Sequence, residues 1–418
     1  MKRQVVVVGA GPAGSAAAFY HAQKGFDVLL LDKESFPREK VCGDAYQATL
    51  YPIFREMGIY EEMEAQIQTE VKHIRIWGPD EVDAKMKVEH GEWIIPRRIG
   101  DDIIRRAALR AGADWLEGFD ATELVVKKGC VKGVKGIYNN EEVVIEADMV
   151  IVANGSHSVL GRQMGIFNND ENRYFYAMRG YWDGIENMEP NTSNWIYDPL
   201  WMPVEDRELF EKYYFQPGWV NTINKEGTSA SIGFCVPAGL LRAHNMSLDQ
   251  FFNYWKENSI IGKTYLKNAY CVDGMKGWRL PCADRIQKNY CNGAMFLGDV
   301  ASCPDPAYEY GIAPAMFGGK ISADVTEKAF ATGDFSENVT KEMYEKLSAA
   351  FDKQWASYSI IRNSICSKPE VAKAMIQFCR SQPGYDQGEV YFGATFGKFL
   401  QQVLKQNASM TFGKQKEN

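Results

Sequence analysis

The sequence predicts an α/β fold (α+β overall), with a doubly wound parallel sheet, a second domain on an antiparallel sheet and a C-terminal helical segment. The first evidence is a strand–turn–helix–strand order: a β-branched strand over 4–8, an alanine-rich helix over 13–24 and an apolar strand over 28–32. This is the βαβ unit of a doubly wound sheet. The other evidence is an aromatic, strand-rich middle and a C-terminal part with helically spaced apolar residues. We therefore expect a first domain over 1–167 and 281–335, an antiparallel-sheet domain over 168–280, and a helical segment over 336–418.

Composition excludes several classes of protein. The chain has 418 residues, of which 45% are hydrophobic and 24% charged, so it is globular and long enough for two or three domains. Its formal net charge is −7 and it has no basic run, which argues against a nucleic-acid partner. Nine scattered cysteines form no Cys-x-x-Cys pair and only five histidines are present, so we expect no metal site.

The same features predict where the protein resides. Scattered cysteines in a long chain indicate reduced thiols and a cytoplasmic location. The apolar run near the N-terminus is too short for a signal peptide, and no apolar stretch approaches the ~18 residues of a membrane-spanning helix. Peripheral contact with a membrane surface stays open.

A glycine-rich turn joins the first strand to the first helix. Gly9-Ala10-Gly11-Pro12-Ala13-Gly14 fits Gly-x-Gly-x-x-Gly, in which the first glycine turns the chain, the second admits a pyrophosphate and the third lets helix and strand pack closely. Asp32 ends the second strand, where a carboxylate can accept hydrogen bonds from ribose hydroxyls. The pattern alone is weak, but with its strand, its helix and the acid it predicts dinucleotide binding.

Two later strands also end in polar turns. Residues 149–152 lead into Asn154-Gly155, and 295–297 lead into Gly298-Asp299. Because the carboxyl ends of parallel strands line the ligand crevice of a doubly wound sheet, these turns can reach the far half of a long dinucleotide. Ordinary turns after strands are the alternative for each turn taken singly.

Several segments together resemble the geranylgeranyl reductase family, which lies beside flavin-dependent halogenases and aromatic hydroxylases in one superfamily of FAD-dependent oxidoreductases. The segments that carry the resemblance are Gly9–Gly14, Asp32–Lys33, Phe36–Asp44, Ala153–Gly155, Gly298–Asp299, Asp305–Ile312 and Tyr344–Arg362. The resemblance implies a glutathione-reductase-like Rossmann domain that binds FAD. It also implies that the cofactor-binding residues are Gly9, Gly11, Pro12, Ala13, Gly14, Asp32, Lys33, Arg38, Cys42, Arg97, Asn154, Gly155, Asp299, Gly311 and Ile312.

The residues support some of these assignments independently. Gly311 has no Cβ and suits a backbone pressed against a flat ring. Arg97 or Arg98 precedes a predicted helix and is a candidate phosphate partner, although a solvated arginine pair explains at least one of them equally well. Asn154 stands where the family has aspartate, which removes a charge and keeps an acceptor.

The candidate catalytic residues are Tyr308, Glu309, Tyr310 and Cys42. If the loop before Gly311 lies over the flavin, Glu309 or a tyrosine can donate a proton to a substrate while the flavin gives a hydride. A structural loop with polar side chains is the alternative. Cys42 is a candidate gate or proton relay by its place in the family motif, and a small packing residue otherwise.

The expected reaction is the reduction of a carbon–carbon double bond in an apolar substrate. The alternative is oxygen chemistry on an aromatic or apolar molecule, by a monooxygenase or halogenase. Asp305-Pro306 is closer to the halogenases, which also need a lysine, and Lys72 is the candidate. Only Trp219 remains of the family's aromatic substrate motif, so a long prenyl substrate is in doubt.

A non-catalytic flavoprotein that carries electrons is the third hypothesis. No second Gly-x-Gly-x-x-Gly occurs, so no dedicated nicotinamide domain is expected. NAD(P)H must therefore visit the flavin transiently, or electrons must come from a protein donor.

Overall fold

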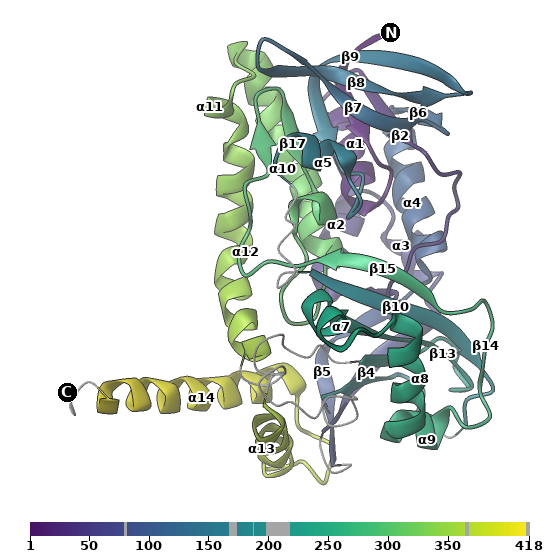
Figure 1. The fold of residues 1–418 in the computed structure, drawn as a ribbon, viewed down its shortest axis with the longest axis vertical. Helices are drawn as coiled ribbons and strands as arrows, with labels where there is room; N and C mark the ends of the chain where they lie inside the picture. The colour runs from purple at the N-terminus through teal and green to yellow at the C-terminus, as the bar shows by residue number, and fades with distance from the viewer. Residues whose placement is uncertain (79–81, 167–173, 187, 198–217, 364–367, 415–418) are drawn as a thin grey trace. The chain divides into compact units, whose positions relative to one another are not determined.

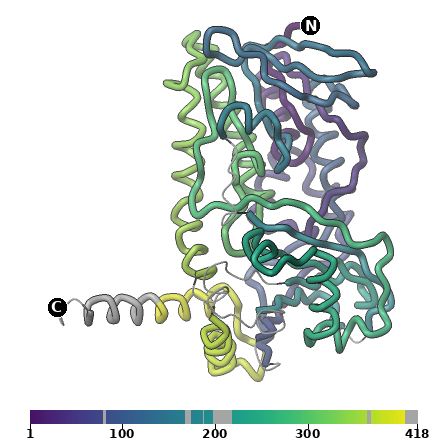
Figure 2. Tube along the Cα trace, in the orientation of Figure 1, coloured from purple at the N-terminus to yellow at the C-terminus, as the bar shows by residue number. Residues whose placement is uncertain are grey.

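The computed structural model describes residues 1–78, 82–166, 174–186, 188–197, 218–363 and 368–414. It divides into two compact units (Figures 1 and 2). The first unit comprises Met1–Ile67, Ile95–Ala177 and Gly277–Ser359, and the second comprises Gln68–Ile94, Met178–Lys276 and Ile360–Asn418.

The first unit is built on a sheet in the order β16-β17-β9-β1-β2-β6, which is parallel from β17 to β6. These strands are β1 (Lys2–Val8), β2 (Val28–Asp32), β6 (Asp114–Glu117), β9 (Glu141–Val152), β16 (Tyr290–Cys291) and β17 (Ala294–Phe296). A β-meander of β7 (Asp120–Lys127), β8 (Cys130–Tyr138) and β9 extends it. Val5 to Val8 are buried on both faces, as in a parallel sheet covered on each side.

The register of this sheet brings four strand ends to one edge. Val8 pairs with Leu31 and with Val152, and Val152 pairs with Phe296. The chain leaves these ends at Gly9, at Lys33, at Ala153 and at Leu297. The predicted doubly wound sheet with its converging turns is therefore confirmed.

Two helices far apart in the sequence pack closely in this unit. Helix α1 (Pro12–Gln23) lies against α10 (Ile312–Thr332) (Figure 1). A Cβ on Gly319 of α10 would lie 2.6 Å from the Ala17 backbone nitrogen, closer than atoms approach. Buried His21 joins the same pair of helices, with Nε2 2.9 Å from Thr326 Oγ1, and burial lowers its pKa to about 4.

The remaining elements of the first unit are short apart from α4 and α12. They are β3 (Ala45–Tyr46), η1 (Ala48–Leu50), α2 (Tyr51–Glu56), α3 (Tyr60–Glu64), α4 (Arg97–Arg110), α5 (Val159–Gln163), η4 (Gly298–Ala301), α11 (Glu337–Thr340) and most of α12 (Glu342–Ile361). Helix α4 also packs on α1.

The second unit contains a mostly antiparallel sheet in the order β14-β10-β13-β12-β11-β4-β5. Its strands are β4 (Thr69–Trp77), β5 (Asp83–Ile94), β10 (Tyr174–Asp183), β11 (Thr192–Ile196), β12 (Gly218–Thr222), β13 (Ser229–Pro237) and β14 (Tyr270–Cys271). Residues 174–177 of β10 belong to the first unit, and so does β15 (Lys276–Pro281) from residue 277 on. Strand β11 pairs with β4 in the parallel direction. Three helices follow β13, namely α7 (Ala238–His244), α8 (Leu248–Asn258) and α9 (Ile260–Tyr265).

The C-terminal part is helical, as predicted, with α12, α13 (Pro369–Arg380) and α14 (Phe392–Lys414). The predicted domain boundaries stay a prediction. The two compact units group residues 68–94 and 360–418 with the second sheet. Among the residues described, none of the helices combines the length and the apolar character needed to cross a membrane.

The contact of α1 with α10 predicts the effect of one added methyl group. Gly319→Ala should destabilise the first unit by about 1–3 kcal/mol, because the new Cβ meets rigid backbone atoms of α1. Urea unfolding followed by circular dichroism measures the change.

Gly318→Ala is the matched control. Its Cβ would meet side-chain atoms, Met343 Cε at 3.2 Å and Leu297 Cδ2 at 3.4 Å, which can move slightly. A loss of stability as large for Gly318→Ala as for Gly319→Ala would contradict the close approach of the two helices.

Candidate functional site

The glycine turn after β1 depends on the absence of two side chains. Gly9 has φ 100°, and a Cβ there would lie 2.4 Å from the Ala153 carbonyl oxygen. A Cβ on Gly14 would lie 1.8 Å from the Gly9 carbonyl oxygen. No side chain caps α1 at Gly11, and Pro12 is its first residue. The first N–H groups of a helix have no partner within it, so this end of α1 can bind a phosphate.

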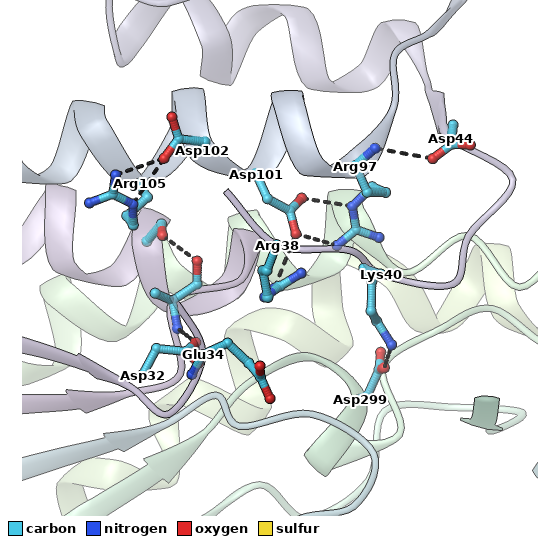
Figure 3. Close-up of polar contacts among 12 residues, drawn as sticks. Asp32, Glu34, Arg38, Lys40, Asp44, Arg97, Asp101, Asp102, Arg105 and Asp299 are labelled. Carbon is cyan, nitrogen blue, oxygen red and sulfur yellow. Dashed lines mark hydrogen bonds and ion pairs between the residues drawn. The ribbon is translucent and has the colours of Figure 1, made fainter. Parts of the chain in front are cut away.

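Asp32 stabilises this turn directly. Its Oδ2 accepts a hydrogen bond of 2.7 Å from the backbone N–H of Ala10, and its Oδ1 accepts one of 2.9 Å from Glu34 (Figure 3). Carboxylate oxygens accept more than one hydrogen bond, so both retain capacity for a ribose hydroxyl. The neighbouring Lys33 is exposed and lies 3.9 Å from Glu34.

A buried ion network lies beside the turn, and its central residue was not found from the sequence. Asp101 on α4 has a fully buried side chain. Its Oδ1 and Oδ2 accept hydrogen bonds of 2.7 and 2.9 Å from Arg97, and Arg38 Nη2 lies 3.1 Å from Oδ2 (Figure 3). Burial by itself raises the pKa of Asp101, but the two arginine charges hold it below its usual value.

Of the arginines predicted to lie near the cofactor, Arg38 and Arg97 both belong to this network. Arg38 Nη2 lies 3.3 Å from the position of a Cβ on Gly11, and Arg38 Nη1 is buried with no hydrogen-bond partner among the described residues. The backbone N–H of Arg97 donates to Asp44 Oδ1. Arg97 is buried, whereas the side chain of Arg98 is largely exposed. The spacing of Arg97 and Asp101, four residues apart on one helix face, is the signal that could have revealed the network.

The turn after β9 presents unsatisfied polar atoms. Asn154 Oδ1 and Ser156 Oγ are buried and have no hydrogen-bond partner in the part of the chain that the structure describes. Gly155 has φ 79°. Such buried atoms are rare in native proteins unless a water or a ligand completes them.

Asp299 is the second residue of η4, which begins at Gly298 shortly after the end of β17. Its carboxylate accepts no hydrogen bond from the described residues, and Lys40 Nζ lies 3.9 Å from Oδ2 (Figure 3). A Cβ on Gly311 would lie 3.7 Å from Asp299 Oδ1, so the residue that precedes α10 and Ile312 lies near this carboxylate.

The loop that carries the candidate catalytic residues is organised by Asp305. Its buried carboxylate accepts backbone hydrogen bonds of 2.9 Å from Ala307, 2.7 Å from Tyr308 and 2.9 Å from Tyr310. Burial raises the pKa of Asp305 to about 6, while these donors oppose the increase. Glu309, between the two tyrosines, has φ 60°, a left-handed conformation that costs energy for a residue with a side chain. Asp305 therefore fixes the backbone around Glu309.

The other predicted residues lie in different surroundings. Cys42 is half-buried and interacts electrostatically with Lys40 and Arg97. Lys72 and Trp219 both belong to the second unit. The Lys72 side chain is 59% exposed and lies 3.6 Å from Glu70. Trp219 on β12 is half-buried and is the cross-strand partner of Gly233 on β13.

The residues present in the first unit fit FAD. The uncapped start of α1 and the buried, unsatisfied Arg38 Nη1 suit a diphosphate, and Asp32 and Asp299 suit hydroxyl groups. Asn154 Oδ1 adds a buried acceptor. Among the described residues, no group of three or more His, Cys, Asp or Glu side chains could hold a metal ion.

Comparison with known proteins agrees with this fit. Residues 2–207 match the family described as FAD binding domain. The chain is 28% identical over 348 residues to digeranylgeranylglycerophospholipid reductase of Methanosarcina acetivorans, covering 82% of this chain and 79% of that protein.

Two solved structures share the fold. A geranylgeranyl bacteriochlorophyll reductase-like protein of Thermoplasma acidophilum is 21% identical, with a TM-score of 0.80 and 96% of each chain covered. A flavin-dependent brominase is 19% identical, with a TM-score of 0.74, 98% of this chain and 100% of that chain covered. The predicted resemblance and fold are therefore confirmed.

The buried network predicts a strong effect of removing one charge. Asp101→Asn should destabilise the protein by about 3–5 kcal/mol at neutral pH, because it leaves the buried Arg97 and the half-buried Arg38 without their carboxylate. Since the pKa of Asp101 is lowered, its contribution exists above the usual carboxyl pKa and is lost as the pH falls. Urea unfolding at several pH values should therefore show the two proteins converging in acid.

Asp102→Asn is the matched control on the same helix. Asp102 pairs with Arg105 and Arg106 in a more exposed position, so its loss should cost no more than about 1 kcal/mol. Equal losses for the two variants would contradict the assigned role of Asp101.

Proposed function

We propose that this chain, an FAD-dependent oxidoreductase whose residues 2–207 match the FAD binding domain family, reduces a carbon–carbon double bond of an apolar substrate. The observation that carries the proposal is the Asp305 loop. It fixes Tyr308, Glu309 and Tyr310 immediately before Gly311, which lies near Asp299. The similarity to a digeranylgeranylglycerophospholipid reductase over 82% of the chain supports the same class of reaction.

The protein's own residues would hold the cofactor and move the proton. The start of α1 and Arg38 would bind the diphosphate, Asp32 a ribose hydroxyl, and Asp299 the hydroxyls of the ribityl chain. Asp101 would keep Arg38 in place. When bound, reduced FAD supplies a hydride from its N5 atom.

The addition is balanced by a proton from the loop. One alkene carbon receives the hydride, and its neighbour receives a proton from Glu309 or a flanking tyrosine, which solvent then reprotonates. Two electrons leave the flavin and two C–H bonds form in the product. One carboxylate oxygen of Glu309, Oε1, is buried, as a proton donor shielded from bulk water must be.

The electrons come from NAD(P)H, which visits the flavin transiently, or from a protein donor. We place the protein in the cytoplasm, and the described cysteines are all free thiols, in keeping with a reducing compartment. An apolar or aromatic small molecule is the proposed substrate, and neither a nucleic acid nor a metal is part of this proposal.

The direct test is anaerobic and follows a single turnover. The reduced holoenzyme is mixed with geranylgeranyl diphosphate or a digeranylgeranylglycerophospholipid. We expect the oxidised flavin spectrum to return as the lipid gains two hydrogens for each bond reduced, measured by mass spectrometry. If no alkene reoxidises the flavin, the proposed reaction is wrong, although the FAD site is unaffected by that result.

Glu309→Gln should slow this reoxidation by about 10²-fold or more, which is the usual effect of losing a general acid, and should leave FAD bound. Glu345→Gln on α12 removes a surface carboxylate of the same unit and should leave the rate unchanged. Tyr308→Phe and Tyr310→Phe identify the donor if Glu309→Gln turns over normally. Wild-type rates in all three loop variants would remove the loop from the mechanism.

The alternative function is oxygen chemistry, by a monooxygenase or halogenase. The brominase fold and Asp305-Pro306 favour it, whereas the exposed ion pair of Lys72 with Glu70 does not resemble a shielded catalytic lysine. Stopped-flow mixing of the reduced enzyme with oxygen separates the two. A long-lived flavin hydroperoxide spectrum supports the alternative, and rapid peroxide release supports the reductase. Turnover of any kind contradicts the third hypothesis, a non-catalytic electron carrier.

A further inference from the structure

Lys40 lies in the candidate cofactor site, although neither the glycine motif nor the catalytic loop includes it. Its side chain is only 18% exposed. The ammonium nitrogen lies 3.9 Å from the centre of the Trp278 ring and 3.9 Å from Asp299 Oδ2. In Figure 3 the side chain of Lys40 extends from the loop towards Asp299. The lysine charge is therefore directed at the carboxylate that we assign to the flavin ribityl chain.

The Trp278 ring gives this charge a fixed position. An ammonium group over an indole face is attracted by the electrons of the ring. The ring itself is held by His157, whose imidazole packs edge to face at 4.8 Å. His157 belongs to the same turn as Asn154 and Ser156, with their unsatisfied buried atoms. The arrangement thus links the ends of β9 and β17 through one lysine.

The charges around Lys40 act in opposite directions. Burial lowers its pKa to about 8; Asp299 and the Cys42 thiol favour the charged form, whereas Arg97 and Arg38 disfavour it. The pKa of His157 is also lowered, first by burial and then by Lys40, so the imidazole adds no charge near pH 8. The positive charge at this point is thus present in neutral solution and lost in mildly alkaline solution.

We propose that Lys40 is a positioning residue of the FAD site, which holds the Asp299 carboxylate in place and supplies a positive charge that favours reduced over oxidised flavin. The proposal rests on FAD binding and is independent of the reaction that the flavin performs. Without the ammonium group, Asp299 is a half-buried negative charge with no facing cation, beside an anionic cofactor. Reduction by two electrons and one proton adds one negative charge to the flavin, and the lysine charge favours that form over the oxidised one.

The consequence is that FAD affinity and the flavin midpoint potential depend on the protonation of Lys40, in addition to the cofactor's own dependence on pH. As the pH rises through about 8, Lys40 releases its proton, and both FAD affinity and the flavin midpoint potential should fall. By linkage, reduction of the flavin raises proton occupancy at Lys40 by the same coupling. The potential should therefore fall more steeply with pH in this window than on either side.

The experiment measures two properties of the holoenzyme, without turnover, from about pH 6.5 to 9.5, which spans the shifted lysine pKa. One is the FAD dissociation constant, from flavin fluorescence released on dilution. The other is the midpoint potential, by equilibration with a reference dye. The proteins compared are wild type, Lys40→Met, Lys40→Arg and Lys353→Met.

Lys40→Met keeps the aliphatic stem and removes the charge. At pH 7 we expect FAD affinity to fall about tenfold and the potential to fall by about 30 mV, the equivalent of tenfold for a two-electron couple. In this variant, the FAD affinity and the midpoint potential should show no added pH dependence near pH 8. Lys40→Arg keeps a charge that does not titrate, so it should hold the low-pH properties up to pH 9.5. Lys353→Met removes an exposed lysine of α12 and should match wild type.

Three outcomes would overturn the proposal. The first is a wild-type pH profile in Lys40→Met, which would make the lysine a bystander. The second is an equal, pH-independent loss in both Lys40 variants, which would indicate a role in packing alone. The third is the same change in Lys353→Met, which would indicate a general effect of net charge. Failure of the alkene experiment leaves all of these measurements valid, so the two proposals fail separately.

Discussion

The architecture of the first unit depends on how closely the start of α1 approaches the ends of the strands. Gly14 lies over the Gly9 carbonyl at a distance that no Cβ permits, and Gly9 is also too close to the Ala153 carbonyl for a Cβ. These two approaches bring the helix N-terminus, the turn after β1 and the turn after β9 together. Gly319 of α10 also lacks a side chain where a Cβ would not fit, so α10, from a distant part of the sequence, packs closely on α1. The site therefore exists because three positions lack side chains.

A site made from distant segments also needs interactions that hold their polar groups, and buried ion pairs fill that role here. Asp101 joins α4 to the loop that carries Arg38, and Asp44 joins the same loop to the backbone of Arg97. A buried charge without a partner is strongly unfavourable, so these contacts favour one position of that loop. Asp305 does the same for the loop before α10 with backbone donors instead of arginines.

Features that depend on neighbouring residues could be predicted from the sequence, whereas contacts between residues far apart in the sequence could not. The strand–turn–helix pattern and the glycine spacing specify the first βαβ unit because each depends on neighbouring residues only. Strand β4, in contrast, pairs with β11 more than a hundred residues away in the sequence, and no local pattern marks β4 and its neighbour β5 as members of the second sheet. The same holds for the contact of Asp101 with the distant Arg38, although its pairing with Arg97 is local, and for Lys40, whose importance appears only when Trp278 and Asp299 are brought beside it.

The arginines and the lysine of this site have different roles: the arginines stabilise the fold, and the lysine carries a charge that varies with pH. Arginine stays protonated at every pH that a protein tolerates, so the network of Asp101 with Arg38 and Arg97 persists in neutral and alkaline solution. Lysine loses its proton far more readily when buried, and Lys40 is the cation that Asp299 faces. If the positions were exchanged, the fold would weaken in mild alkali while the cofactor's surroundings stayed constant. With the arginines in the network and the lysine beside Asp299, the fold stays stable in mild alkali. The charge beside the expected flavin then varies with pH.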